Sequence, residues 1–108
     1  MERPRQAVIL AGGRGSRLRP LTDTRPKPMI GFHGKPFLGY LLELLREQGC
    51  ERVLLLLGYL PEVIQAYVGD GRRWGLQVTS FVSAMEDETG RRLALAAGRI
   101  DPVFLMMY

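Results

Sequence analysis

The chain has 108 residues, of which 46% are hydrophobic and 24% are charged. This length excludes a chain of two domains, and the proportion of hydrophobic to charged residues fits one small globular domain. Its apolar runs, such as residues 7–11 and 53–57, are too short for a membrane span or a secretory signal, so a cytoplasmic protein is expected. Cys50 is the only cysteine, which excludes an internal disulfide and a cysteine-cluster metal site, and it should be buried.

Positive charge is concentrated in the first third of the chain. Residues 1–36 carry eight Lys or Arg side chains against Glu2 and Asp23, a net charge of +6. Residues 37–108 carry seven basic and nine acidic side chains, a net charge of −2. This distribution indicates an anionic partner for the first third, either nucleic acid or a phosphate-bearing small molecule.

The first predicted element is a strand at residues 7–10. The run Ala-Val-Ile-Leu is short, apolar and followed by glycines, which is typical of a strand buried on both faces in a parallel sheet. Residues 12–36 are rich in Gly and Pro and predict a long irregular loop. A loop of this length inside a compact domain is usually functional.

Apolar side chains at helical spacing predict a helix over residues 36–48. Pro36 suits its first turn, and Gly49 suits the left-handed position just past its end. The stripe that should face the core consists of Phe37, Leu38, Leu41, Leu42, Leu44 and Leu45.

Strands and helices alternate along the rest of the chain. Strands are predicted at residues 52–57, 76–82 and 103–107, and helices at residues 61–68 and 89–97, with a turn at residues 69–71. This alternation predicts an α/β, Rossmann-like three-layer sandwich with a mostly parallel sheet and right-handed crossovers. Ligands of such sheets bind beyond the carboxyl ends of the strands, and nothing follows the last one here, so the chain is expected to be truncated.

The loop after the first strand carries the strongest functional signal. Gly12, Gly13 and Gly15 allow positive φ and let backbone N–H groups approach phosphate oxygens. Arg14 and Arg17 can add charge-assisted hydrogen bonds to those oxygens. No Lys follows at the position that a Walker A loop requires, and Leu18 would occupy the third glycine position of a dinucleotide fingerprint. The loop is therefore interpreted as a phosphate site of another kind.

A second candidate cation is Lys27, which lies between Pro26 and Pro28. The two prolines restrict the backbone, as a positioned cation requires. Taken alone, a lysine in a proline-rich loop is more often a solvated surface residue. Arg19 and Arg25 are interpreted as surface charges.

Two motifs near the N-terminus resemble the signature of the sugar-phosphate nucleotidyltransferases. They are LAGGRGSRLRPLT at residues 10–22 and RPKPM at residues 25–29, continued by GKPFL at residues 34–38. The segment GDGRRWGL at residues 69–76 is similar to the mannose and heptose guanylyltransferase branch. The resemblance covers essentially the whole chain. It implies a nucleotide-diphospho-sugar transferase fold, with residues 1–108 as the nucleotide-binding part of one domain and the sugar-binding part absent.

The resemblance implies that an NTP and a sugar 1-phosphate give an NDP-sugar and pyrophosphate. The implied nucleotide-binding residues are Leu10, Ala11, Gly12 and Gly13 at the base and ribose, and Gly15, Ser16 and Arg17 at the triphosphate. Arg17 would also neutralise the departing pyrophosphate, and Lys27 would bridge the α-phosphate and the sugar phosphate. Mg²⁺ would screen the phosphates, with its Asp ligand just beyond Tyr108, so the isolated chain should be inactive.

One segment departs from the family pattern. Residues 86–92, EDETGRR, stand where many members have small residues that help to read the nucleotide. Gly90 stays a candidate nucleotide contact, whereas Arg91 and Arg92 are either extra phosphate contacts or solvated residues of a helix start. The base is therefore open, with GTP favoured through the guanylyltransferase-like segment. His33 is expected to be structural or solvated.

Alternatives to a catalytic enzyme stay open. A non-catalytic relative could sense nucleotide or act as a scaffold, although intact Arg17 and Lys27 argue against it. A nucleic-acid-binding module would explain the basic first third, but Phe32 is the only aromatic residue there, so no nucleic-acid partner is expected. Molybdopterin guanylyltransferases and isoprenoid cytidylyltransferases lack the extended motif. No membrane partner is expected, and the complete protein could form a homo-oligomer.

Overall fold

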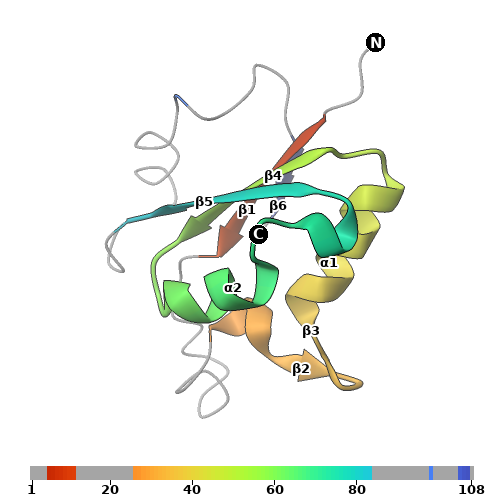
Figure 1. Ribbon diagram of the computed structural model, residues 1–108. Coiled ribbons are helices and arrows are strands. Elements are labelled where there is room, and N and C mark those ends of the chain that lie inside the picture. Colours follow the sequence, from red (N-terminus) through yellow and green to blue (C-terminus); the bar gives the residue numbers. More distant parts are fainter. Residues whose placement is uncertain (1–4, 12–25, 84–97, 99–104, 108) are drawn as a thin grey trace.

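The central sheet contains four parallel strands. The computed structural model describes residues 5–11, 26–83, 98 and 105–107, and the strands within them are β1 (Gln6–Ala11), β4 (Arg52–Leu57), β5 (Gln77–Val82) and β6 (Leu105–Met107). They lie in the order β5-β4-β1-β6, and each pairing is parallel (Figure 1). The predicted parallel α/β sheet is confirmed, and β5 begins one residue later than predicted.

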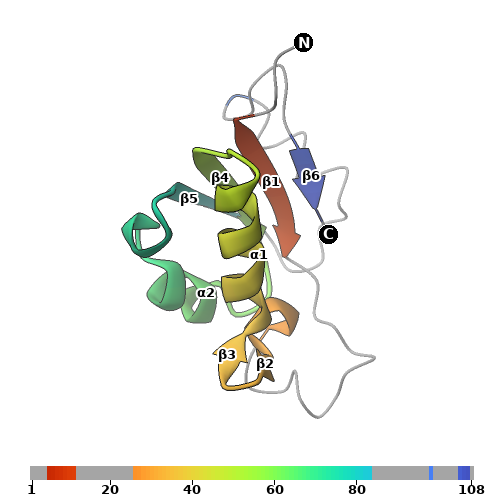
Figure 2. The same cartoon turned by 90° about the vertical axis from the view of Figure 1, so that its right-hand side faces the viewer.

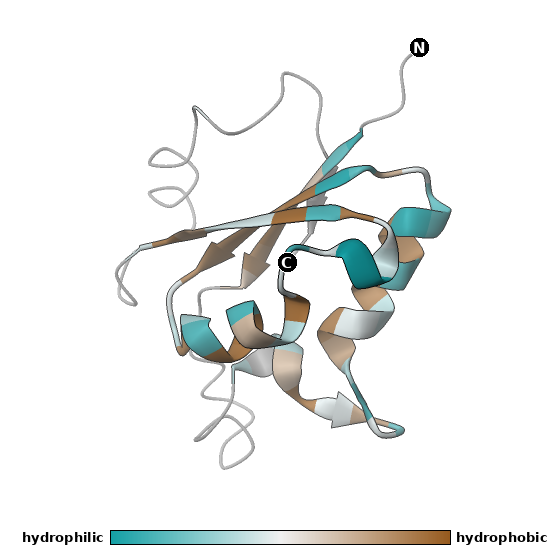
Figure 3. Cartoon of the chain, in the orientation of Figure 1, coloured by the Kyte–Doolittle hydropathy of each residue, from teal (hydrophilic) through white to brown (hydrophobic). Residues whose placement is uncertain are grey.

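Two helices, α1 (Phe37–Glu47) and α2 (Pro61–Val68), cover one face of this sheet (Figure 2). One core cluster joins Leu38, Leu42 and Leu45 of α1 and Ile64 and Val68 of α2 to Ala7, Ile9, Val53 and Leu55 of the strands. The alternate strand residues Val8, Leu54 and Leu56 are equally buried on the other face. Burial on both faces explains why β1 and β4 are almost wholly apolar (Figure 3). The helix predicted at residues 89–97 lies outside the described residues.

The start of α1 differs from the prediction. The helix begins at Phe37, because Pro36 has φ −59° and ψ 143° and belongs to the preceding short strand rather than to the first helical turn. The predicted apolar stripe is also too wide, since Phe37 is 48% exposed and Leu44 is 45% exposed. These two side chains lie on the flank of α1, about a third of a turn away from the face that carries the buried leucines.

The segment before α1 is more regular than predicted. Residues 26–36, expected to be irregular, contain the 3₁₀ turn η2 (Lys27–Met29) and an antiparallel hairpin of β2 (Gly31–Phe32) and β3 (Lys35–Pro36). His33 and Gly34 connect the strands with φ values of 52° and 77°, as a two-residue hairpin turn requires. The Tyr40 hydroxyl of α1 donates a hydrogen bond to the Phe32 carbonyl oxygen at 2.8 Å and ties the hairpin to the helix.

The end of α1 confirms two predictions. Gly49 has a φ of 92°, the left-handed conformation expected just past the helix. Cys50 follows it, donates its N–H to the Leu45 carbonyl oxygen, and is 2% exposed. Burial raises the pKa of the Cys50 thiol above its ordinary value of 9.0, because the apolar surroundings disfavour the thiolate.

Cys50 should therefore resist thiol reagents while the chain is folded, since the thiolate is the reactive form. As the pH rises through about 8.5 to 9, the unfolded thiol loses its proton while the folded one keeps it, so the free energy of unfolding should decrease. Denaturant titrations at several pH values would measure this decrease. The variant Cys50→Ala should show a smaller decrease over the same range, and equal slopes for the two proteins would contradict the assignment.

The segment at residues 69–76 is a turn that leads from α2 into β5. It contains the 3₁₀ turn η3 (Arg72–Trp74) between Gly71 and Gly75, which both have positive φ. The N–H groups of Trp74 and Leu76 donate to the Gly71 carbonyl oxygen at 3.0 Å and 3.1 Å. Because β5 begins directly after this turn, the segment lies at the amino end of the strand.

Candidate functional site

The carboxyl ends of three strands meet at one edge of the sheet. The register pairs Ala11 of β1 with Leu57 of β4, and Leu57 with Val82 of β5, so these strands end level with one another. From β1 the chain moves outward through β4 to β5, whereas β6 lies on the opposite side of β1. Strand order therefore reverses beside β1. Ligands of open α/β sheets bind at such a switch point, outside the carboxyl ends of the strands.

Two of the predicted nucleotide-binding residues lie at this edge. Leu10 and Ala11 are the last two residues of β1, where Leu10 is half-buried and Ala11 is 5% exposed. The Leu10 side chain packs against the core cluster of Val8, Leu54 and Leu56. Because both side chains contribute to the core, what these residues can offer a ligand at the switch point is chiefly their backbone.

The backbone of Lys27 is anchored near the same edge. It lies in η2, where the Met29 N–H donates to the Pro26 carbonyl oxygen at 2.9 Å. Pro26 is buried, and Met29 belongs to the core cluster that also contains Ala11. The turn η2 packs against α1 and against α2, which begins shortly after the carboxyl end of β4. The structure thus brings the Lys27 backbone and the end of β1 into one region.

The other predicted site residues lie outside the described part of the chain. They are Gly12, Gly13, Gly15, Ser16, Arg17 and Gly90. Their contacts stay predictions that rest on the sequence, and the structure contributes the position from which the loop starts, directly after Ala11.

Sequence reasoning did not single out the segment that follows β4. Gly58, Tyr59 and Leu60 lead from the carboxyl end of β4 into α2, next to the end of β1. Tyr59 is 7% exposed, and Leu60 has φ 47° and ψ 54°, a left-handed conformation that costs a non-glycine residue about 1–2 kcal/mol. The sequence signal that could have indicated a sharp turn between β4 and α2 is Pro61, directly after Leu60.

Two searches of the described residues gave negative results. No group of three His, Cys, Asp or Glu side chains in this part of the chain could hold a metal ion. No helix in the same residues is long and apolar enough to cross a membrane.

A family model and the curated relatives of the chain indicate the same protein family. Residues 6–105 match the family model described as nucleotidyl transferase. The chain is 43% identical over 96 residues to the UTP–glucose-1-phosphate uridylyltransferase of Synechocystis sp., which covers 86% of this chain and 25% of the relative. It is 44% identical over 94 residues to the mannose-1-phosphate guanylyltransferase of Mycobacterium tuberculosis, covering 87% of this chain and 26% of the relative.

A solved structure supports the same family. HddC from Yersinia pseudotuberculosis, complexed with GMP-PN, superposes with a TM-score of 0.78 and is 32% identical, covering 94% of this chain and 47% of that one. The chain spans about a quarter of the length of the two curated relatives. Those relatives use different nucleotides, so the comparisons do not select a base.

Proposed function

The chain belongs to the nucleotidyl transferase family, and on this premise we propose that it is the nucleotide-binding part of a sugar-1-phosphate nucleotidyltransferase. The complete enzyme would convert an NTP and a sugar 1-phosphate into an NDP-sugar and pyrophosphate. The curated relatives named above support this reaction. A cytoplasmic location, where nucleoside triphosphates are made and used, belongs to the proposal.

One structural observation carries the proposal. The strand β1 ends at the reversal of strand order and leads directly into the loop with Gly12, Gly13 and Gly15. A switch point followed by a glycine-rich and arginine-rich loop offers backbone N–H groups and guanidinium groups where a nucleotide would bind. The sequence motif and the strand topology thus support the same site independently.

In the proposed reaction, an oxygen of the sugar phosphate attacks the α-phosphorus of the NTP in line. A new P–O bond forms, the bond between the α-phosphorus and the bridging oxygen breaks, and the electron pair leaves with pyrophosphate. The protein contributes positioning and charge stabilisation rather than a covalent intermediate. In this assignment Arg17 stabilises the charge on the pyrophosphate, and Lys27 holds the α-phosphate against the sugar phosphate.

The proposal includes Mg²⁺ as the ion that screens the phosphates from one another. No group of three potential metal ligands occurs in the described residues, so the proposal assigns no Mg²⁺ ligand within them. The chain's own contribution would then be to the nucleotide rather than to the metal.

The nucleotide and the sugar are the open parts of the proposal. The segment at residues 69–76 favoured GTP at the level of sequence, but it lies at the amino end of β5, across the sheet from the switch point. In the proposed arrangement it would therefore lie away from the base. GTP and UTP are supported equally well by the two relatives, which are 44% and 43% identical to the chain.

An assay on the complete protein tests the proposal. Each of the four common NTPs would be combined with glucose 1-phosphate or mannose 1-phosphate, and pyrophosphate release measured with and without Mg²⁺. We expect Mg²⁺-dependent release with one or a few of the pairs, and none from the 108-residue chain alone. Tight NTP binding without release for any pair would instead favour the non-catalytic relative.

A further inference from the structure

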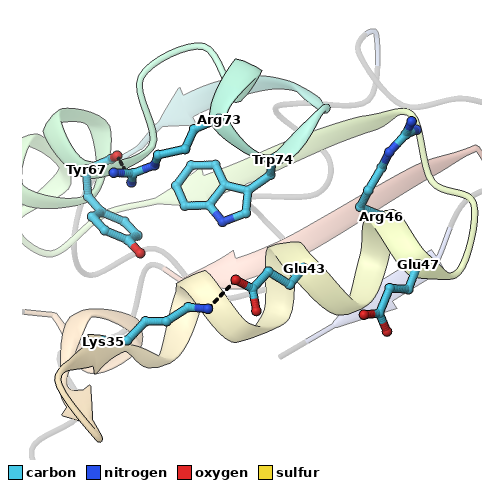
Figure 4. A pocket seen from close by; sticks show the side chains of 7 residues that line it. All are labelled: Lys35, Glu43, Arg46, Glu47, Tyr67, Arg73 and Trp74. Carbon is cyan, nitrogen blue, oxygen red and sulfur yellow. Dashed lines mark hydrogen bonds and ion pairs between the residues drawn. The ribbon is translucent and has the colours of Figure 1, made fainter.

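A groove lies on the solvent side of the helix layer, between α1 and the turn η3. Its volume is about 520 Å³, within the usual range of small-molecule pockets (Figure 4). It is lined by Lys35, Glu43, Arg46, Glu47, Tyr67, Arg73 and Trp74. The last turn of α1 and the turn before β5 form one end of it, so this end is close to the amino ends of β4 and β5. The proposed nucleotide site lies at the opposite edge of the sheet.

One wall of the groove is a fixed pair of aromatic rings. The ring centroids of Tyr67 and Trp74 are 5.4 Å apart at an angle of 60°. The Arg73 guanidinium lies over both rings, 4.6 Å from the Tyr67 centroid and 4.2 Å from the Trp74 centroid, and donates to the Tyr67 carbonyl oxygen at 2.8 Å. These contacts hold the two rings in place before any ligand arrives.

The charges that line the groove do not balance. Lys35 and Glu43 form an ion pair and neutralise each other (Figure 4). Within the described residues, neither Arg46 nor Arg73 pairs with a carboxylate, and Glu47 pairs with no basic group. Two guanidinium groups against one carboxylate leave a net positive charge, which favours an anion.

Hydrogen-bond donors also outnumber acceptors on the walls. The Trp74 indole N–H and the Tyr67 hydroxyl, directed toward α1 in Figure 4, have no hydrogen-bond partner among the described residues. The Arg46 guanidinium adds further donors, and Glu47 adds a free acceptor. A matching ligand has several acceptor oxygens, a negative charge and at least one hydroxyl group to donate.

We propose that this groove binds a phosphate ester of a sugar or another polyol, separately from the nucleotide site. The phosphate dianion would interact with the Arg46 guanidinium, and the Arg73 guanidinium, on the far side of the Trp74 ring in Figure 4, would add positive charge at the other end of the groove. Hydroxyl groups would donate to Glu47 and accept from Trp74, and the carbon skeleton would contact the aromatic wall. This inference does not depend on the proposed function.

Trp74 is the only tryptophan of the chain, so its fluorescence reports directly on the groove. The chain would be titrated with glucose 6-phosphate, inorganic phosphate or glucose at constant ionic strength. We expect a saturable change with glucose 6-phosphate, weaker binding of inorganic phosphate, and no change with glucose. No saturable change up to roughly 10 mM ester, or equal affinities for the ester and inorganic phosphate, would overturn the proposal.

Three variants separate a specific site from general charge attraction. Arg46→Gln should weaken binding of glucose 6-phosphate about ten-fold, through the loss of a charge-assisted contact. Arg72→Gln removes the same charge from a neighbouring residue that pairs with Asp70 outside the groove, and should leave affinity within about two-fold. Glu47→Gln should bind inorganic phosphate as well as the unaltered chain or better. Equal losses in the two arginine variants would overturn the proposal.

Discussion

Replacing Arg17 with alanine in the complete protein should lower the rate of pyrophosphate release by about 1000-fold. In the proposed reaction negative charge builds up on the departing pyrophosphate, and a guanidinium placed there acts mainly in the transition state. The loss should therefore appear in kcat more than in KM. Steady-state kinetics with saturating NTP and sugar 1-phosphate, checked by single-turnover measurements, would separate the two parameters.

Arg19 provides the matched control for this prediction. It belongs to the same loop, carries the same charge and is interpreted as a surface residue. The variant Arg19→Ala should keep turnover within about three-fold of the unaltered enzyme, as expected for a screened charge. Turnover near the unaltered level in Arg17→Ala would refute the catalytic role. Similar losses in both variants would show that the loop acts through its overall charge instead of through one placed guanidinium.

The layered fold was predictable because its signals are local. The strand at residues 52–57 is apolar at five consecutive positions, and these positions are all buried. Gly49 marks the end of α1 because few other residues adopt its φ of 92° at low cost. Burial of Cys50 followed from its residue type. Each signal depends on a few neighbouring residues, so the sequence was sufficient.

Features that depend on contacts across the chain were not predictable. The strands β2 and β3 of the hairpin have two residues each, too short to show any periodicity. The hairpin is held by the Tyr40 side chain of α1, which bonds to Phe32, eight residues earlier in the chain. The exposed flank of α1 at Phe37 and Leu44 depends on which neighbours α1 meets. The groove beside α1 forms only when Tyr67 and Trp74 are packed opposite that helix.

The candidate site was predicted by motif and is supported by topology. The glycine-arginine loop was recognisable in the sequence, but the reversal of strand order beside β1 requires knowing that β6 lies next to it. The segment at residues 69–76 shows the opposite case. Its similarity to guanylyltransferases indicated a branch of the family, and the structure adds that the segment forms the turn before β5.

Replacing Gly71 with alanine should destabilise the chain by about 2–4 kcal/mol, from positive φ and overpacking together. Gly71 has a φ of 89°, and a Cβ at this position would lie 2.5 Å from Val78 Cγ2 and 2.6 Å from the Leu76 carbonyl oxygen. The backbone cannot easily move away, because the Gly71 N–H donates to the Val68 carbonyl oxygen and its own carbonyl oxygen accepts two hydrogen bonds. Urea denaturation followed by circular dichroism would measure the loss.

Gly49→Ala separates the two causes of this loss. Gly49 has nearly the same φ, 92°, but a Cβ there would meet nothing within 4 Å, so this variant should lose only about 1 kcal/mol. Equal losses in the two variants would mean that the contact with Val78 and Leu76 does not matter. In the complete enzyme, Gly71→Ala should lower stability without changing the ratio of kcat/KM for GTP and UTP. A changed ratio would instead indicate that residues 69–76 take part in nucleotide recognition, since a turn that acts only on stability would affect both nucleotides equally.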